Sequence, residues 1–307
     1  MTPRFALGTF TAHGRTFPGL VQGDRVLDLG SRWDSVEALL RGWDLALPEL
    51  RRLAAGDGPW LDAAELGVRA PLRPGQVIQS GANYRTHVID LAMAHRGTDD
   101  PAAREEVAAM MDRRAAEGTP YLFVGLPSAV AGPYDDLVLP GYSGKHDWEL
   151  ELAAVIGRPA FRVTRDQALG HVACYTICND VTTRDLVFRQ DMKEIGTDWF
   201  RAKNAPGFLP LGPWLVPSEF VEGPLRITLS VNGETFQDES TKDLLFDVAA
   251  LVSAASEIVR LEPGDLVLTG SPAGNGMAVG RFLRDGDVME GTITGLGTQR
   301  IRCRDER

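Results

Sequence analysis

Apolar and polar residues alternate along positions 148–157. Every even position there is apolar, whereas the odd positions start with Glu149 and Glu151. A period of two is typical of a β-strand, because neighbouring side chains of a strand point to opposite faces. The pattern therefore predicts a strand with both glutamates on one face. That face continues with Ala153 and Val155, which favours a cavity wall over the alternative, the solvated face of a half-buried antiparallel strand.

Other segments also predict β-strands, separated by a few helices. Strands are expected over 4–10, 25–29, 77–79, 137–139, 173–179, 226–231, 266–269 and 291–302. The pair Asn232-Gly233 is typical of a tight hairpin turn. Helices are expected over 34–40, 48–54, 102–117 and 243–259. The helix at 102–117 follows a capping residue, Asp100, and a proline at the first helical position.

A cluster of prolines and a glycine at 71–75 separates two parts of different character. The first part, 1–72, is predicted to be a small N-terminal α/β module. The second part, 73–307, has mostly strand signals and is predicted to be the larger domain. The sequence therefore predicts an α+β fold that is predominantly β.

Composition and charge narrow the classes of partner. The 307 residues are 44% hydrophobic and carry a net charge of -10, which argues against nucleic acid or an anionic membrane as a partner. No apolar run is long enough to span a bilayer and the first residues lack a secretory pattern, so we expect a cytoplasmic location. The three cysteines, Cys174, Cys178 and Cys303, follow no zinc or disulfide pattern and are expected to be reduced.

A third carboxylate, Asp180, follows the predicted strand at 173–179. Glu149 and Glu151, adjacent on one strand face, would repel each other and raise each other's pKa unless a cation or solvent neutralised them. Carboxylates without histidine or thiolate suit a hard cation rather than zinc. The sequence thus indicates a site for Mg²⁺, Mn²⁺ or Ca²⁺.

Five blocks of sequence occur in an order and spacing that resemble the fumarylacetoacetate hydrolase family. They lie at 148–157, 175–185, 208–214, 269–274 and 295–297, and the resemblance covers roughly residues 75–303. It points to the branch of acylpyruvate and diketo-acid hydrolases. It implies a mixed β-roll of packed sheets, usually a homodimer, with a divalent metal, preferably Mg²⁺, on Glu149, Glu151 and Asp180. Family members act on small 2-oxo acids.

The segment 83–90 is similar to a family block that carries a histidine and a glutamate. Here His87 has Asp90 three residues later, and helical spacing would let the carboxylate orient the imidazole as a general base for water. Because the family has Glu where this chain has Asp, the shorter side chain changes the reach of that contact. Taken without the block, His87 would be an ordinary surface residue. Tyr84, in the same block, is expected to bind substrate.

Three further residues match positions that the family uses. Lys203 falls where the family has a lysine in contact with substrate, and a positive charge there would help neutralise an enolate or carboxylate. Ser271 keeps a hydroxyl, where threonine is commoner, for the substrate carboxylate. Arg184 matches a substrate-binding arginine, although an ion pair with a nearby carboxylate explains it equally well.

The glycines at 274–280 resemble a dinucleotide-binding loop. Only 27 residues follow Gly280, and they predict strands and turns, so no room is left for a βαβ unit with its ribose-binding acid. We expect these glycines to let the backbone approach the substrate instead.

The resemblance implies a metal-dependent hydrolase that cleaves the C–C bond of a 2,4-dioxo acid, such as an acylpyruvate or a diketo sugar acid. One alternative is a decarboxylase or isomerase of oxaloacetate-like 2-oxo diacids, which shares the metal and the enolate. A more distant alternative is a non-enzymatic ligand-binding protein. The segment 91–120 is expected to fold over the site as a helical lid, with a peripheral or dimer-contact helix as the equal alternative.

Overall fold

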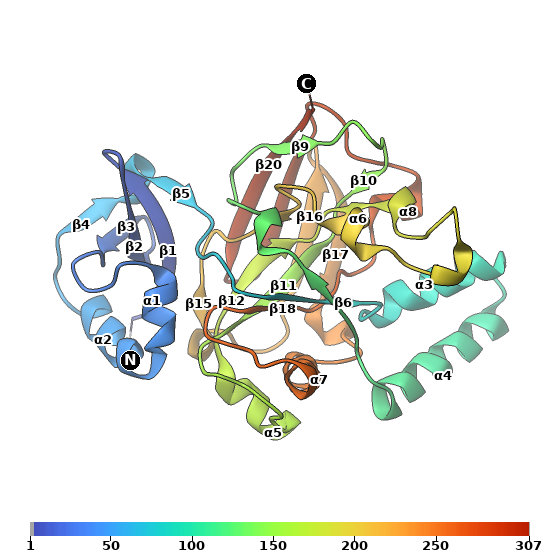
Figure 1. Ribbon diagram of the computed structural model, residues 1–307, viewed down its shortest axis with the longest axis horizontal. Coiled ribbons are helices and arrows are strands. Elements are labelled where there is room, and N and C mark those ends of the chain that lie inside the picture. The colour runs from blue at the N-terminus through green and yellow to red at the C-terminus, as the bar shows by residue number, and fades with distance from the viewer. Residues whose placement is uncertain (1–2, 307) are drawn as a thin grey trace.

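The computed structural model describes residues 3–306, and three large β-sheets form its framework (Figure 1). One sheet belongs to the N-terminal module, and the other two lie in the larger part of the chain. Eight α-helices, most of them short, lie around the sheets in the described residues. The predicted fold class, α+β and predominantly β, is confirmed. None of the described helices is both long and apolar enough to cross a membrane.

The N-terminal sheet has five strands and lies at the left of Figure 1. In spatial order its strands are β4 (Trp60–Asp62), β3 (Arg25–Asp28), β2 (Arg15–Gln22), β1 (Ala6–Ala12) and β5 (Gly67–Arg69). Helices α1 (Val36–Arg41) and α2 (Trp43–Ala54) complete this part. Strand β2 was not predicted, and the predicted start of α2 is too late because Pro48 lies inside the helix rather than at its first position.

The central sheet has six strands and carries the predicted glutamate strand in its interior. In spatial order these are β15 (Val216–Pro217), β12 (Val172–Asn179), β11 (Leu150–Ile156), β18 (Leu266–Leu268), β6 (Val77–Gly81) and β7 (Tyr121–Gly125). All seven residues of β11 are buried. Since neither face of β11 is solvated, the alternative of a half-exposed strand is wrong.

The two faces of the central sheet pack into different cores. Leu152 and Ala154 belong to a core shared with the second large sheet and with helix α7 (Val248–Ile258). Ala153 and Val155, on the glutamate face, pack with apolar residues of the N-terminal module such as Leu7. The cavity-wall interpretation is therefore wrong beyond Glu151, because a neighbouring sheet covers that part of the strand.

The second large sheet contains five strands. In spatial order these are β17 (Glu234–Ser240), β16 (Arg226–Val231), β19 (Val288–Ile293), β20 (Gly297–Asp305) and β9 (Leu137–Leu139). The hairpin turn at Asn232-Gly233 is confirmed, and both residues have positive φ. The single strand expected at 291–302 is wrong: β19 and β20 form a hairpin, and positive φ at Gly295 and Gly297 marks its turn.

Two pairs of short strands complete the β structure. They are β10 (His146–Asp147) with β13 (Thr182–Thr183), and β14 (Leu209–Pro210) with β8 (Val130–Ala131). Three short helices accompany them: α5 (Arg165–Ala168), α6 (Trp199–Lys203) and α8 (Gly276–Val279). The helix expected at 243–259 begins only at Val248, because Asp247 caps it through a hydrogen bond from Ala250 N.

Helices α3 (Arg85–Arg96) and α4 (Pro101–Glu117) form a hairpin that projects at the right of Figure 1. Helix α4 matches its predicted bounds closely. It packs on α3, where Val107 and Met111 share a core with Ile89. Asp243 fixes the N-terminal end of α3, because its carboxylate accepts hydrogen bonds from the backbone N–H and the hydroxyl of Thr86 at 2.8 and 3.1 Å.

Candidate metal centre

The register of β11 and β12 brings three carboxylates together. Glu149 lies immediately before β11 and Glu151 within it, while Asp180 immediately follows β12. The strands are antiparallel, so the end of β12 lies beside the start of β11, and Asp180 N donates to Glu149 O at 2.8 Å. One oxygen of each carboxylate lies within 4.8 Å of the others, and all three residues are buried. The structure thus brings together the three residues that the sequence singled out.

Lys203, at the end of α6, links two of these carboxylates. Its Nζ donates to Glu149 Oε2 at 2.6 Å and to Asp180 Oδ2 at 2.5 Å, and its side chain is 3% exposed. The ring centres of Phe123 and Trp199 lie 5.8 and 5.7 Å from the same nitrogen. The ammonium group is therefore buried between carboxylates and aromatic rings, not solvated.

Arg184 and Asp147 form a second buried ion pair beside Glu149. The guanidinium donates to Asp147 Oδ2 at 2.7 Å and to Glu149 Oε1 at 2.9 Å. Asp147 also accepts hydrogen bonds from the backbone of Gly276 and Met277, at 2.7 and 3.0 Å. The sequence analysis missed Asp147, whose only local signal was a charge directly before the alternating segment.

The pKa values of the carboxylates diverge because their partners differ. Burial raises the pKa of Glu151 well above its usual value, and the nearby charge of Asp180 adds to this. Burial also raises the pKa of Asp180, to about 6, although Lys203 opposes the shift. Burial alone would raise the pKa of Glu149 too, but Arg184 and Lys203 hold it below its usual range. Without a further cation, two carboxylates of the cluster therefore resist ionisation.

The residues present fit a divalent metal ion. Four buried carboxylates, those of Asp147, Glu149, Glu151 and Asp180, face the buried Lys203 and the partly buried Arg184, so the fully ionised cluster carries an excess of two negative charges. Buried charge is costly unless it is paired. The cluster offers three carboxylate oxygens close enough to bind one ion. Oxygen is the ligand atom that Mg²⁺, Mn²⁺ and Ca²⁺ prefer.

His87 lies on the first turn of α3 and faces the acidic cluster. It is half-buried, and burial lowers the pKa of its imidazole, while Glu149 is the largest of the opposing charges. The predicted partner, Asp90, is exposed and accepts a hydrogen bond from Arg104 at 2.7 Å instead. Among residues 3–306, no hydrogen bond joins Asp90 to His87. Asp90 therefore pairs with α4 rather than with His87, although its charge is among those that oppose the lowering of the His87 pKa.

Tyr84 and Ser271 both lie inside the protein. Tyr84 is fully buried, and its hydroxyl makes no hydrogen bond with the described residues. The hydroxyl of Ser271 accepts hydrogen bonds from the side-chain amides of Gln237 and Asn275, at 2.9 and 3.1 Å. Ser271 is therefore fixed by two amides, whereas packing surrounds the ring of Tyr84 and its backbone pairs with Leu244.

The glycine-rich loop serves the packing of the chain. A Cβ atom on Gly274 would lie 1.9 Å from the carbonyl oxygen of Phe236, and one on Gly276 would lie 1.9 Å from that of Arg281. Trp148 Nε1 donates to Gly274 O at 3.0 Å. These glycines allow close backbone contacts around the loop that Asp147 holds.

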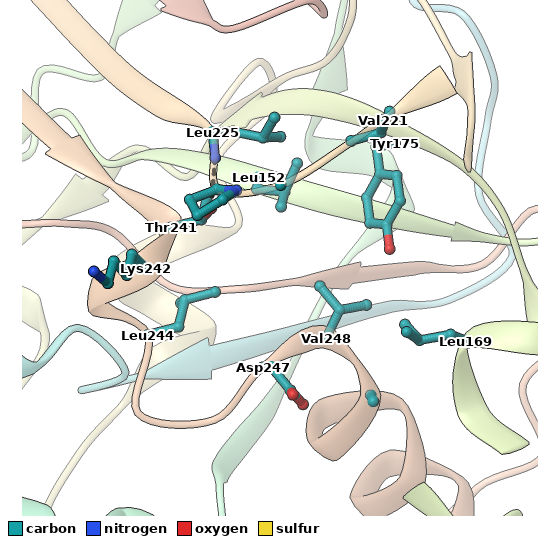
Figure 2. Close-up of a pocket in the computed structure, with 13 residues that line it drawn as sticks. Leu152, Leu169, Tyr175, Val221, Leu225, Thr241, Lys242, Leu244, Asp247 and Val248 are labelled. Carbon is teal, nitrogen blue, oxygen red and sulfur yellow. Dashed lines mark hydrogen bonds between the residues drawn. The ribbon is translucent and has the colours of Figure 1, made fainter. Parts of the chain in front are cut away.

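A separate pocket of about 390 Å³ lies on the opposite side of β11 (Figure 2). Leu152 and Tyr175 line it from the central sheet, and Leu244 and Val248 line it from the segment that leads into α7. Its walls are largely apolar, and none of the three clustered carboxylates lines it. This pocket is therefore distinct from the carboxylate cluster.

Comparison with known proteins identifies relatives along nearly the whole chain. The sequence model of the family described as Fumarylacetoacetate (FAA) hydrolase C-terminal matches residues 76–304. The 2,4-didehydro-3-deoxy-L-rhamnonate hydrolase of Sphingomonas sp. (strain SKA58) is 36% identical over 97% of this chain and 95% of that protein. The mitochondrial oxaloacetate tautomerase FAHD2A of Bos taurus is 35% identical over 85% of this chain and 77% of that protein.

A solved structure has the same architecture. The crystal structure of a probable 2-hydroxyhepta-2,4-diene-1,7-dioate isomerase from Mycobacterium abscessus has a TM-score of 0.78 at 30% identity, and the alignment covers 99% of each chain. The relatives are therefore enzymes of several kinds, including a hydrolase, a tautomerase and an isomerase, that act on small molecules.

Proposed function

Because the chain belongs to the fumarylacetoacetate hydrolase family, as its motifs predicted, we propose that it is a divalent-metal-dependent hydrolase of a 2,4-dioxo acid. It would cleave the C–C bond of an acylpyruvate or a diketo sugar acid to a carboxylic acid and a 2-oxo acid. The observation that carries the proposal is the buried set of Glu149, Glu151 and Asp180, with oxygens within 4.8 Å of one another. Mg²⁺ is the preferred ion, with Mn²⁺ and Ca²⁺ as alternatives.

The cluster and its neighbours divide the chemical work. When bound, the metal would supply Lewis-acid stabilisation of the enolate that forms as the bond breaks. Lys203 fixes the carboxylates of Glu149 and Asp180 and adds positive charge beside the enolate. His87, whose pKa is lowered by burial, is neutral at pH 7 and takes the proton of the water that attacks the distal carbonyl.

The remaining predicted residues have more limited roles in this proposal. The hydroxyl of Ser271 accepts two amide hydrogen bonds and donates one long hydrogen bond, with 3.3 Å between Ser271 Oγ and Pro272 O. The hydroxyl can therefore rotate and donate to the substrate carboxylate instead. Arg184 binds substrate only through the N–H groups that Asp147 and Glu149 leave free. Tyr84 contacts substrate only if its fully buried ring moves, and otherwise supports the site by packing.

A second candidate is a tautomerase, isomerase or decarboxylase of an oxaloacetate-like acid. It uses the same metal and enolate but needs no activated water. Two observations favour it: Asp90 pairs with Arg104 rather than with His87, and one relative is an oxaloacetate tautomerase. Its general base would face a carbon-bound or enol proton in place of water.

One panel of assays separates the two candidates. Purified protein with Mg²⁺ or Mn²⁺ is given 2,4-dioxo acids and β-keto diacids, and release of 2-oxo acid, release of CO₂ and loss of enol absorbance are followed separately. For a hydrolase, His87→Ala should lower turnover by about 10²- to 10⁴-fold. Metal-driven decarboxylation should survive that substitution.

The control is His95→Ala, because His95 lies on the same helix and is exposed. A loss as large in His95→Ala would mean that α3 had been disturbed as a whole. If no compound of the panel is converted and calorimetry detects no metal binding, the protein is a non-enzymatic ligand-binding member of the family.

We also propose a homodimer, which large exposed apolar side chains support. Val124 is 60% exposed, and Phe188 and Phe200 are 58% and 70% exposed. Val124 lies on β7, and both phenylalanines lie in the segment 188–200. The strand and the segment are in contact, since Trp199 Nε1 donates to Tyr121 Oη at 2.6 Å. Light scattering of the wild type should give twice the chain mass, and Phe200→Ser should weaken that association.

The proposed lid is the segment 91–120. Its helix α4 packs on α3 through Val107 and Met111, so closure would have to move both helices or separate them. Metal plus a substrate analogue should slow proteolysis between 99 and 118. Unchanged proteolysis would leave α4 as a peripheral or dimer-contact helix.

A further inference from the structure

Gln79 is a buried polar residue whose side chain lies close to the carboxylate cluster. It lies on β6, is 1% exposed, and shares its sheet face with Val77, which is fully buried. A buried amide without hydrogen bonds costs free energy, so its contacts need an explanation. Only one of its two polar atoms has a partner among the described residues: Nε2 donates to Asp180 Oδ1 at 2.6 Å, and Oε1 has none.

The carboxylate of Asp180 is therefore held from both sides. Gln79 Nε2 donates a hydrogen bond to Oδ1, and Lys203 Nζ donates one to Oδ2 at 2.5 Å. Two donors on opposite oxygens fix the rotation of the carboxylate plane. The remaining electron pairs of the Asp180 oxygens then point in a defined direction. This direction determines how Asp180 would coordinate a metal ion.

A glycine on the neighbouring strand makes room for this amide. Gly125 lies on β7, and a Cβ atom there would lie 2.7 Å from Gln79 Oε1 and 3.2 Å from Nε2. Gly125 has no positive φ that would itself require glycine. The space beside Gly125 is thus filled by the end of the Gln79 side chain, and an added methyl group would push that end away from its place.

We propose that Gln79 is a positioning residue for the metal site, which sets metal affinity by orienting Asp180, and that Gly125 permits this orientation. The inference rests on the proposed metal site. Partners of metal-binding carboxylates commonly change metal affinity by about 10- to 100-fold when they are removed. The sequence alone did not indicate a role for Gln79, because its partner Asp180 lies 101 residues away in the chain.

The primary test is Gln79→Met, which keeps the length of the side chain and removes the donor. Calorimetric titration of chelator-treated protein with Mn²⁺ should show affinity weaker by about 10- to 100-fold. The electron paramagnetic resonance spectrum of bound Mn²⁺ should also change, since the orientation of one ligand changes. A purely structural role would lower the unfolding temperature and leave both of these readouts as in the wild type.

Gln299→Met is the matched control. Gln299 is also 1% exposed, and its Oε1 has no partner in the described part of the chain, but its Nε2 donates to the backbone carbonyls of Ile177, Pro210 and Gly212. Its replacement should lower stability and leave Mn²⁺ affinity within about 2-fold of the wild type, because no ligand of the metal is touched.

Gly125→Ala provides an independent test that spares the fold, because only the flexible end of one side chain must move. It should weaken Mn²⁺ binding in the wild-type background and cause no further loss in Gln79→Met, since the two changes act on the same contact. Equal losses in both backgrounds, or wild-type affinity in Gln79→Met, would overturn the proposal. If the wild type itself binds neither Mg²⁺ nor Mn²⁺, the proposed function fails and the role of Gln79 fails with it.

Discussion

The carboxylate cluster and the α3–α4 hairpin both belong to the proposed site, but different forces hold them. The cluster is buried, and the register of β11 and β12 fixes its carboxylates beside Lys203. The hairpin is tied together at its surface by ion pairs, among them Asp90 with Arg104 at 2.7 Å. Charges in the buried cluster act at low dielectric, whereas those of the hairpin are screened by water. Loss of a charge should therefore have a large effect in the cluster and a small effect at the surface of the hairpin.

Among these charged groups, the largest effect is expected for Glu151→Gln. Glu151 accepts a hydrogen bond from Gly270 N at 2.7 Å, which glutamine can still accept, and within residues 3–306 it makes no ion pair that the change would break. Loss of this ligand charge should lower metal affinity and reduce turnover by about 10²- to 10³-fold, as removal of one electrostatic contact to a transition state typically does. Turnover with saturating Mg²⁺ is the measurement.

Glu290→Gln is the control for charge, because Glu290 forms an exposed ion pair with Arg300 at 3.1 Å. It should leave turnover unchanged. If Glu151→Gln is as active as this control, the buried carboxylates do not form the metal site.

A smaller effect concerns the pH dependence of the stability of metal-free protein. Burial raises the pKa of Asp180 from 3.8 to about 6, and that of Glu151 is raised as well. In the pH range between the unfolded and folded pKa values the folded state binds more protons, so its stability falls as pH rises. Two groups with lowered pKa values contribute in the opposite sense, Glu149 only below its usual value of 4.5 and the single imidazole of His87 below 6.5.

Thermal unfolding of chelator-treated protein should therefore occur at a lower temperature near pH 7.5 than near pH 5. Addition of Mg²⁺ should raise the unfolding temperature at pH 7.5 more than at pH 5, because the ion binds the ionised carboxylates. Equal stability at both pH values, with and without Mg²⁺, would mean that these carboxylates are not destabilised by one another and by burial.

The smallest effect is expected for Asp90→Asn. The side chains of Asp90 and Arg104 are 47% and 50% exposed, so loss of their ion pair should cost no more than about 1 kcal/mol of unfolding free energy. Turnover should stay within about 3-fold of the wild type, well short of the loss expected when a general base is disabled. Arg104→Gln should have the same small effect, and the double variant should add nothing. A 100-fold fall in turnover for Asp90→Asn alone would restore the predicted pairing with His87.

The sequence predicted best what local pattern determines. Strict alternation identified the strand around Glu151, and the Asn232-Gly233 pair located the hairpin between β16 and β17. It failed where tertiary context decides. Apolar residues before Val248 resemble the start of a helix, but Asp247 caps α7 later, and turn glycines divide the strand signal at 291–302 into two strands. These outcomes depend on caps and turns that a period alone does not encode.

The same distinction applies to the site. Residue types and motifs were enough to identify Glu149, Glu151 and Asp180, which lie together in the structure. They were not enough to identify Asp147 or Gln79, because the non-adjacent partners of the Asp147 carboxylate lie 37 to 130 residues away along the chain and the partner of Gln79 lies 101 residues away. Contacts of this kind follow from the packing of the sheets and have no local signature.

The central claim is that the buried carboxylates hold a divalent metal on which C–C cleavage depends. The most direct measurement is the rate of 2-oxo acid release from an acylpyruvate by chelator-treated wild-type protein as Mg²⁺ is added back. We expect almost no release without the ion and full activity at one ion bound per chain, in line with one cluster of three carboxylates in the described residues. Metal-free protein that cleaves the substrate as fast as the Mg²⁺-loaded form would contradict the claim.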